Sequence, residues 1–354
     1  MKTGEKIRVL VGEDSPFMRK IIVDAISRER DMEVISAVAD GKEVLRKAVE
    51  LKPDCITLDL EMPRMDGLEV LRYLMGEWPT PVVVVSAHTS NGAQLTMKCL
   101  EYGAVDFVPK GNLATPFPVD ELIRKVRIAA SVDVEKIRYY PPDVSLVTKK
   151  ERIHRSKADV CVVIGASTGG PNALSHVLNK LPAGIKACIL IIQHMPPNFT
   201  RYLADRLSFV SPFSVREADY GDELKEGTVL VAPGGMHLFV EGKYGVPSVM
   251  LLERNRDSRS PCPSIDYAMT TASRVFGENL IGVVMTGMGN DGVAGAMAIK
   301  RIGGKIICQD EGTSLVNGMP GSVVREGLAD AVVALESIPG TIERFVEEVV
   351  SARR

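Results

Sequence analysis

The sequence contains few cysteines and no long run of apolar residues. Four of its six cysteines stand inside apolar stretches, and all lie far apart: Cys55, Cys99, Cys161, Cys188, Cys262 and Cys308. This spacing favours buried, reduced thiols over disulfides or a zinc site. No apolar run is long enough for a signal peptide or a membrane span. These absences predict a cytoplasmic protein with no direct membrane insertion.

An excess of charge of either sign is also absent. The chain of 354 residues has 43 Lys and Arg against 45 Asp and Glu, a formal net charge of −2. Proteins that bind nucleic acid over a broad surface carry a basic excess, so we expect no nucleic-acid partner. The length predicts two domains, because single cores rarely grow so large.

Short apolar runs alternate with helical patterns through most of the chain, which predicts two α/β domains. Residues 6–130 contain five such β-then-α units, typical of a flavodoxin-like receiver with a five-stranded parallel sheet. Residues 131–157 are charged and lack a sustained period, which indicates a linker. Residues 158–354 predict a doubly wound, mainly parallel sheet, with strands expected at 160–165, 187–193, 228–232, 280–286 and 305–309 and an inserted hairpin at 237–253.

Four of the first five expected strands end in charged, polar or aromatic side chains. They are Glu13, Asp14, Asp59, Ser86, Phe107 and Lys110. Ligands of such sheets collect at the carboxyl ends of the strands. The carboxylates suit Mg²⁺, which we expect Glu13, Asp14 and Asp59 to bind. If Asp59 is the nucleophile, Ser86 and Lys110 are placed to contact the incoming phosphoryl oxygens.

These motifs, "GEDS", "LDLEMPRMDG", "VSAHT" and "DFVPKG", resemble the receiver domain of two-component response regulators. The resemblance implies that Asp59 is the phospho-acceptor and that Ser86 is the switch hydroxyl. It also implies that Lys110 is the family's lysine and Phe107 its switch aromatic. One departure is Glu13, where many receivers have Asp.

The segment "VCVVIGASTGGPNAL" places Ser167 in a G-x-S-x-G pattern where a strand gives way to a helix. A serine there stands near free backbone N–H groups that stabilise an oxyanion. The pattern alone is weak, because a serine at this junction is more often only a helix cap.

A base and a carboxylate follow neighbouring strands. His194 comes directly after "ACILIIQ", and Asp291 lies in the glycine-rich turn after "LIGVVMT". Together with Ser167 they form a candidate catalytic triad. The chain order differs from that of α/β-hydrolases, which argues against that superfamily. His237 in "APGGMHLFV" is the rival base, and it either lines the site or is a solvated loop histidine.

Two further residues in "CPSID" need an interpretation. Ser264 and Asp266 are better explained as caps of the helix that follows them than as catalytic groups.

The order of "IGASTGGP", "QHMPP", "APGGMH", "PSID" and "MTGMGNDG" after a receiver resembles the chemotaxis protein-glutamate methylesterase family over essentially the whole chain. The resemblance implies that Ser167, His194 and Asp291 form the triad of a phosphorylation-activated serine esterase. Its substrate is then a glutamate methyl ester on the cytoplasmic helices of methyl-accepting chemoreceptors, and its kinase the chemotaxis histidine kinase. Deamidation of receptor glutamines is a second implied activity. The esterase chemistry needs no cofactor, and its oxyanion donors are expected among the N–H groups of Thr168, Gly169, Gly170 and Met285.

Two other functions remain open from the residues alone. One is a receiver-regulated serine hydrolase of small esters or peptides, which a deep pocket favours. The other is a non-enzymatic response regulator with an interaction or DNA-binding module, which requires a basic recognition helix. The sequence has no such helix.

Overall fold

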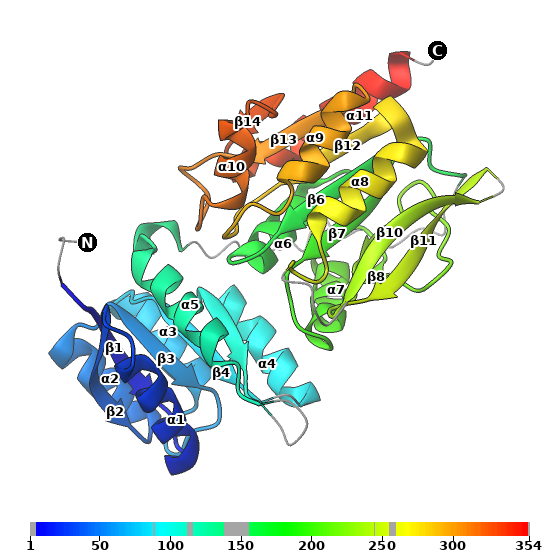
Figure 1. Ribbon diagram of the computed structural model, residues 1–354. Helices are drawn as coiled ribbons and strands as arrows, with labels where there is room; N and C mark the ends of the chain where they lie inside the picture. The colour runs from blue at the N-terminus through cyan, green and yellow to red at the C-terminus, as the bar shows by residue number, and fades with distance from the viewer. Residues whose placement is uncertain are drawn as a thin grey trace. The chain divides into compact units, whose positions relative to one another are not determined.

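The computed structural model describes residues 5–87, 89–111, 116–137, 156–243, 245–254 and 260–352. The chain divides into two compact units, residues 1–139 and 140–354, which we describe separately (Figure 1). Most of the linker expected at 131–157 lies outside the described residues, and its exact bounds stay a prediction. The short 3₁₀ helix η1 (Val134–Lys136) stands near its start.

The first unit is a five-stranded parallel sheet in the order β2-β1-β3-β4-β5, as the sequence predicts. Its strands are β1 (Ile7–Gly12), β2 (Met32–Val38), β3 (Cys55–Asp59), β4 (Val82–Ser86) and β5 (Asp106–Pro109). Its helices are α1 (Pro16–Ser27), α2 (Gly41–Leu51), α3 (Gly67–Glu77), α4 (Ser90–Glu101) and α5 (Val119–Ser131).

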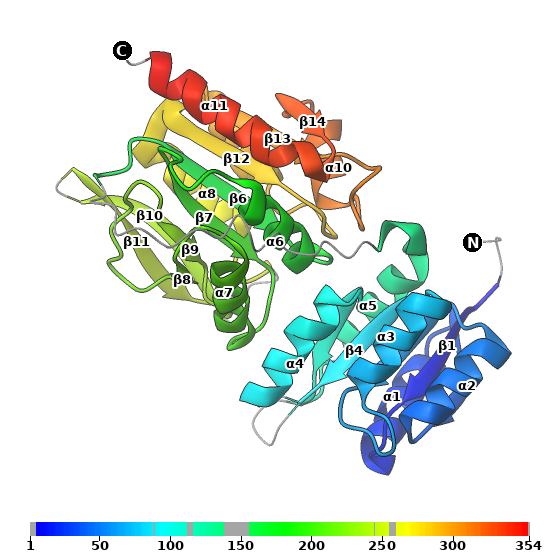
Figure 2. The same cartoon turned by 180° about the vertical axis from the view of Figure 1, so that it is seen from behind.

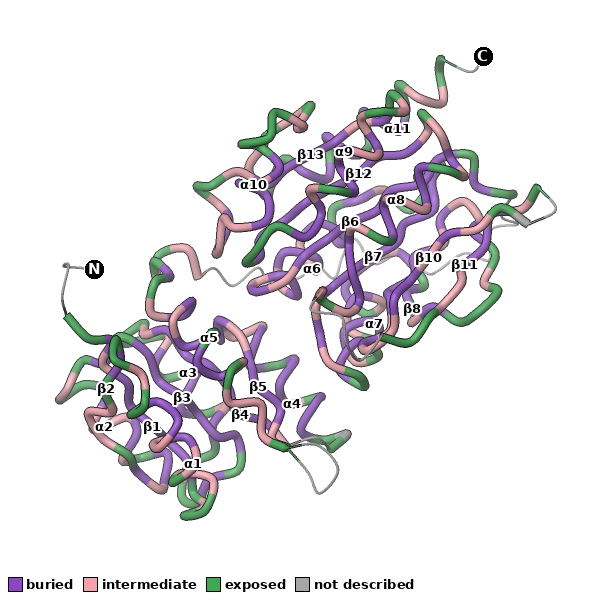
Figure 3. The backbone as a smooth tube through the Cα atoms, viewed as in Figure 1, coloured by how far each residue is buried: buried purple, intermediate pink, exposed green. Residues whose placement is uncertain are grey.

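The helices of this unit cover both faces of the sheet. Helices α1 and α5 contact each other, and α3 contacts both α2 and α4 (Figures 1 and 2). Every residue of β3 and β4 is buried (Figure 3). Strands buried on both faces read as continuous apolar runs, which explains why the sequence identifies them well.

The second unit contains a seven-stranded sheet in the order β14-β13-β12-β6-β7-β9-β8, with parallel pairing throughout. The strands are β6 (Cys161–Ala166), β7 (Cys188–Gln193), β8 (Val215–Glu217), β9 (Val229–Val231), β12 (Leu280–Val284), β13 (Lys305–Gln309) and β14 (Ala331–Val333). The helices are α6 (Gly170–Lys180), α7 (Phe199–Val210), α8 (Ile265–Phe276), α9 (Val293–Arg301), α10 (Met319–Arg325) and α11 (Ile338–Ala352), with 3₁₀ turns η3 (Gly277–Asn279) and η4 (Leu335–Ser337).

Helices α8 and α9 pack on one face of this sheet, and α6, α7 and α11 on the other (Figures 1 and 2). The expected hairpin is present as the antiparallel pair β10 (Met236–Lys243) and β11 (Val246–Glu253). Strand β10 packs against α8. The doubly wound α/β architecture is therefore confirmed. Within the described part of the chain, we find no helix with the length and apolar character needed to cross a membrane.

Candidate functional site

The first unit carries a cluster of charged side chains at the carboxyl edge of its sheet. Asp59 ends β3 with 2 % exposure, and Glu13, directly after β1, is fully buried. Lys110 follows β5, and its Nζ lies 3.0 Å from Glu13 Oε1 and 2.8 Å from Asp59 Oδ2. The structure therefore brings these three side chains together from three different strands.

This cluster has the oxygen donors that a hard divalent cation requires. One oxygen from each of Glu13, Asp14 and Asp59 can be chosen so that all lie within 4.8 Å of one another. Burial, followed by the charge of Asp59, raises the pKa of Glu13 to about 7. Glu13 Oε2 is buried and has no hydrogen-bond partner among the described residues. A cation at this point would satisfy that oxygen and favour the ionised carboxylates, so the residues fit Mg²⁺.

Ser86, at the end of β4, faces helix α4. Its hydroxyl donates to the Gly92 carbonyl at 3.1 Å and accepts from the Thr96 hydroxyl at 2.7 Å. Phe107 is 2 % exposed, and Lys125 Nζ lies 5.0 Å from the centre of its ring. In this structure the expected switch hydroxyl is thus bonded to α4, and the expected switch aromatic is packed inside the unit.

In the second unit, Ser167 and His194 follow two paired strands. Ala166 at the end of β6 pairs in register with Gln193 at the end of β7, and the His194 N–H donates to the Ala166 carbonyl at 3.1 Å. The Gln193 side-chain amide donates to the carbonyls of Ser167 at 2.9 Å and His194 at 3.2 Å. These contacts fix the nucleophile candidate beside the base candidate.

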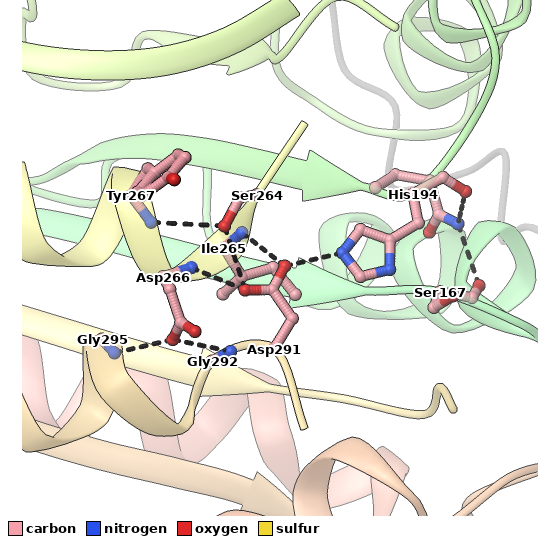
Figure 4. Close-up of polar contacts among 10 residues, drawn as sticks. Ser167, His194, Ser264, Ile265, Asp266, Tyr267, Asp291, Gly292 and Gly295 are labelled. Atoms are coloured by element: carbon pink, nitrogen blue, oxygen red, sulfur yellow. Dashed lines mark hydrogen bonds and ion pairs between the residues drawn. The ribbon is translucent and has the colours of Figure 1, made fainter. Parts of the chain in front are cut away.

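Asp291 reaches the same edge from the turn after β12. His194 Nε2 lies 2.8 Å from Asp291 Oδ2, which also accepts the Ile265 N–H at 2.8 Å (Figure 4). Asp291 Oδ1 accepts the Ser264 hydroxyl and the Asp266 N–H, both at 3.0 Å. Burial alone would raise the pKa of Asp291, but His194 and the two N–H groups outweigh it, so the pKa lies below its ordinary value. This carboxylate is therefore well suited to remain ionised beside the imidazole.

The imidazole lies between Asp291 and Ser167, as Figure 4 shows. Since Nε2 donates to the carboxylate, Nδ1 is the ring nitrogen left to act as a base. No hydrogen bond joins Ser167 to His194 among the contacts of the described residues. Catalytic hydrogen bonds are often long before substrate binds, so this geometry is compatible with a serine–histidine pair.

The backbone around Ser167 corrects two of the expected oxyanion donors. The Met285 N–H donates to the Gly165 carbonyl at 2.9 Å, because the ladder with β6 continues one residue beyond β12. The Gly170 N–H donates to the Ser167 carbonyl at 2.8 Å. Neither group is therefore free to bind an oxyanion.

Two other N–H groups are better placed, and sequence reasoning missed one of them. The N–H groups of Gly169 and Met288 have no acceptor among the described residues. Gly287, which precedes Met288, packs so closely on Ser167 that a Cβ there would lie 2.7 Å from Ser167 Cβ. The Thr168 carbonyl is fixed by the Thr286 hydroxyl at 3.0 Å. Gly169 and Met288 thus remain as candidate oxyanion donors, and the expected role of Thr168 stays a prediction.

His237 is neither a solvated loop residue nor the partner of Asp291. It stands on β10 with 5 % exposure, and its ring centre lies 4.8 Å from that of Tyr267. Burial lowers its pKa below the ordinary value, and the charge of Asp291 offsets this only in part. The loop interpretation is therefore wrong, and the carboxylate contact belongs to His194.

Ser264 and Asp266 have contacts that the sequence did not indicate. Ser264 caps α8 as expected, accepting the Tyr267 N–H at 3.4 Å, but its hydroxyl also reaches Asp291. Asp266 does not cap its own helix; its carboxylate accepts N–H groups at the start of α9. No local motif signals a contact between segments so far apart in sequence.

Comparison with known proteins agrees with both units. Residues 9–127 match the family model of the response regulator receiver domain, and residues 162–342 match that of the CheB methylesterase. The chain thus combines a receiver domain with a methylesterase domain. A crystal structure of the Thermotoga maritima CheB methylesterase catalytic domain superposes with a TM-score of 0.51 at 40% identity, covering 53% of this chain and 98% of that one.

Relatives that match nearly the whole chain identify the family more specifically. The protein-glutamate methylesterase/protein-glutamine glutaminase of Pyrococcus abyssi is 44% identical over 98% of this chain and 95% of its own. The protein of the same name from Thermotoga maritima is 40% identical over 98% of this chain and 100% of its own. The chain belongs to the protein-glutamate methylesterase/protein-glutamine glutaminase family. The family and the kind of enzyme expected from the sequence motifs are therefore confirmed.

Proposed function

We propose that this protein is a phosphorylation-activated serine esterase that hydrolyses glutamate methyl esters on chemoreceptors and releases methanol. The observation that supports it most is the hydrogen bond of 2.8 Å between His194 and a buried, ionised Asp291, beside Ser167. The names of the relatives supply the substrate class and the second activity, deamidation of glutamine. The methyl-accepting receptors and the chemotaxis histidine kinase are the partners we propose.

The esterase reaction follows from the roles of three side chains. Ser167 Oγ attacks the ester carbonyl carbon while its proton passes to His194 Nδ1. The imidazolium then gives that proton to the departing methoxide, which leaves as methanol. Asp291 holds the tautomer with the proton on Nε2 and stabilises the imidazolium. Water, deprotonated by Nδ1, hydrolyses the glutamyl ester of Ser167 and restores the hydroxyl.

The developing negative charge on the carbonyl oxygen needs preorganised donors. Gly169, two residues after Ser167, and Met288, next to the Gly287 that packs on Ser167, carry the unpaired N–H groups we propose for this role. Gly169 has a φ of +77°, a conformation that favours glycine, so a side chain there would strain the turn that presents its N–H. The same site accepts a glutamine side chain, in which case ammonia leaves in place of methanol.

The receiver unit regulates the esterase activity. Asp59 is the proposed phosphoryl acceptor, with Lys110 contacting the phosphoryl oxygens after its release from the ion pair with Asp59. Glu13, Asp14 and Asp59 would hold Mg²⁺, which supplies charge neutralisation for phosphoryl transfer when it is bound. Ser86 leaves its bond with α4 to contact the phosphoryl group, and this exchange shifts the population of receiver conformations.

Methanol release from a methylated receptor tests the proposal. The wild-type chain should release methanol, and a small phosphodonor with Mg²⁺ should increase the rate. Ser167→Ala should release none, whereas Ser175→Ala should match wild type, because that serine lies on α6 and donates to the Pro171 carbonyl. Methanol release by Ser167→Ala would reject the serine mechanism.

The alternatives give different results in the same experiment. A hydrolase of small esters would cleave p-nitrophenyl acetate but leave the methylated receptor intact. A non-enzymatic response regulator would cleave neither. No observation in the described residues favours either one over the receptor esterase.

A further inference from the structure

Helices α8 and α9 begin beside each other, and each start depends on the other. Helix α9 has Gly292 at its N-cap, so it has no side chain of its own to bind its first N–H groups. Gly292 directly follows Asp291. The stability of this helix start therefore bears on the position of the triad carboxylate.

Asp266, in the first turn of α8, supplies the missing cap. Its Oδ1 accepts the Gly292 N–H at 2.9 Å and the Gly295 N–H at 2.7 Å (Figure 4). A carboxylate at a helix N-terminus satisfies unpaired donors and interacts favourably with the helix dipole. Gly295 packs against Met269 of α8 so closely that a Cβ would lie 2.6 Å from Met269 Cβ, which keeps the two helices in contact.

Asp291 in turn binds the start of α8. Asp291 accepts the N–H groups of Ile265 and Asp266, the first two residues of α8. Each aspartate therefore caps the helix to which the other is attached. This reciprocal arrangement ties the turn containing Asp291 to α8 through four hydrogen bonds to backbone N–H groups.

We propose that Asp266 is a positioning residue for catalysis: by binding the N–H groups of Gly292 and Gly295, it holds Asp291 on His194. This inference rests on the proposed function, since it assigns a role toward the proposed triad. Asp266 touches neither His194 nor Ser167 through any of these bonds, so it acts only through Asp291. Catalytic geometry tolerates small displacements poorly: about 1 Å of misplacement can lower a rate on the order of 10²-fold.

The environment of Asp266 agrees with such a role. Burial, together with the nearby charge of Asp291, raises the pKa of Asp266 to about 6, although the Gly295 and Gly292 N–H groups lower it. Burial beside a second carboxylate is unfavourable for an ionised group, and the two N–H bonds of α9 offset this cost only in part.

Three substitutions in the full-length chain test the proposal. Asp266→Ala removes both bonds and should lower kcat for methanol release on the order of 10²-fold with KM nearly unchanged. Asp266→Asn keeps an Oδ1 that accepts both N–H groups and should restore most of kcat. Asp266→Glu keeps the carboxylate but lengthens its arm, so it should fold and show an intermediate kcat. Proton NMR should find the downfield signal of His194 Nε2–H lost or shifted in Asp266→Ala, changed less in Asp266→Glu and retained in Asp266→Asn.

Asp330→Ala is the matched control. Asp330 also accepts a backbone N–H of this unit, from Ile306 at 2.7 Å, but at the opposite end of β13 from the triad. The Asp330→Ala variant should be less stable than wild type but should have the same kcat and the same His194 signal. The positioning role is wrong if Asp266→Ala keeps the wild-type kcat while Ser167→Ala is inactive. If Asp266→Ala does not fold, Asp266→Glu takes its place in this comparison. If Ser167→Ala is itself active, the proposed esterase mechanism is wrong.

Discussion

Replacing Asp291 by Asn removes the charge of the proposed triad while keeping its shape. The carboxylate accepts four hydrogen bonds, two at each oxygen, whereas an amide has only one oxygen. The favoured orientation places the amide oxygen toward His194 and Ile265. Its NH₂ group then faces the Ser264 hydroxyl, which can rotate to accept, and the Asp266 N–H, which loses its acceptor.

The expected loss of activity follows from the missing charge. Imidazolium and carboxylate atoms 2.8 Å apart attract each other by about 6 kcal/mol at an effective dielectric constant of about 20. That energy corresponds to a loss of kcat on the order of 10⁴-fold, the same order as the known effect of this change in a serine protease triad. One lost hydrogen bond to a charged acceptor should also lower the free energy of unfolding by about 1.5–3 kcal/mol.

The contribution of Asp291 to the free energy of unfolding depends on pH. Because the pKa of Asp291 in the folded protein lies below its ordinary value of 3.8, its ionised form stabilises the fold above that pH. This contribution is lost as the pH falls through the lowered pKa. Methanol release measures kcat, and chemical denaturation at neutral pH and below the lowered pKa measures stability. A loss of kcat under about tenfold, or a stability difference that does not narrow in acid, would refute this reasoning.

The other predictions concern the base, the receiver and its metal. His194→Ala should reduce methanol release on the order of 10³-fold or more, while His237→Ala should stay within about tenfold of wild type; the reverse order would transfer the role of base to His237. Asp59→Asn should abolish the acyl phosphate that mass spectrometry detects after incubation with a small phosphodonor, and undiminished label would reject Asp59. Removing Mg²⁺ with EDTA should stop labelling of the wild-type chain but leave its basal methanol release unchanged; labelling that persists would contradict the metal site. Thr96→Val removes the hydroxyl that donates to Ser86 and should change the lifetime of the acyl phosphate, so an identical lifetime would show that this bond plays no part.

The sequence predicts the strand ends of both sheets well, for a physical reason. Parallel strands buried on both faces are continuous apolar runs, and polar residues directly after them must lie at one edge. Asp59, Ser167 and His194 all follow this rule. Strands β8 and β14 were not predicted, because they lie at the two edges of their sheet and are only partly buried, so neither is a continuous apolar run.

Contacts between segments that are distant in the chain could not be predicted from the sequence. Asp266 has the position of an ordinary cap for α8, and only the packing of α8 on α9 brings it to Gly292. Met285 likewise stands next to the predicted strand end, but its N–H continues the ladder with β6. The first free N–H beyond that strand belongs to Met288, which no periodic pattern distinguishes from its neighbours.

The most direct test of the central claim is to trap the covalent intermediate. The wild-type chain is mixed with a peptide that carries the methylated glutamate of a receptor, quenched in acid and digested for mass spectrometry. The account predicts a glutamyl adduct, formed with loss of methanol, on the peptide that contains Ser167, and no adduct in Ser167→Ala. An adduct on any other residue, or methanol release by Ser167→Ala at the wild-type rate, would contradict it.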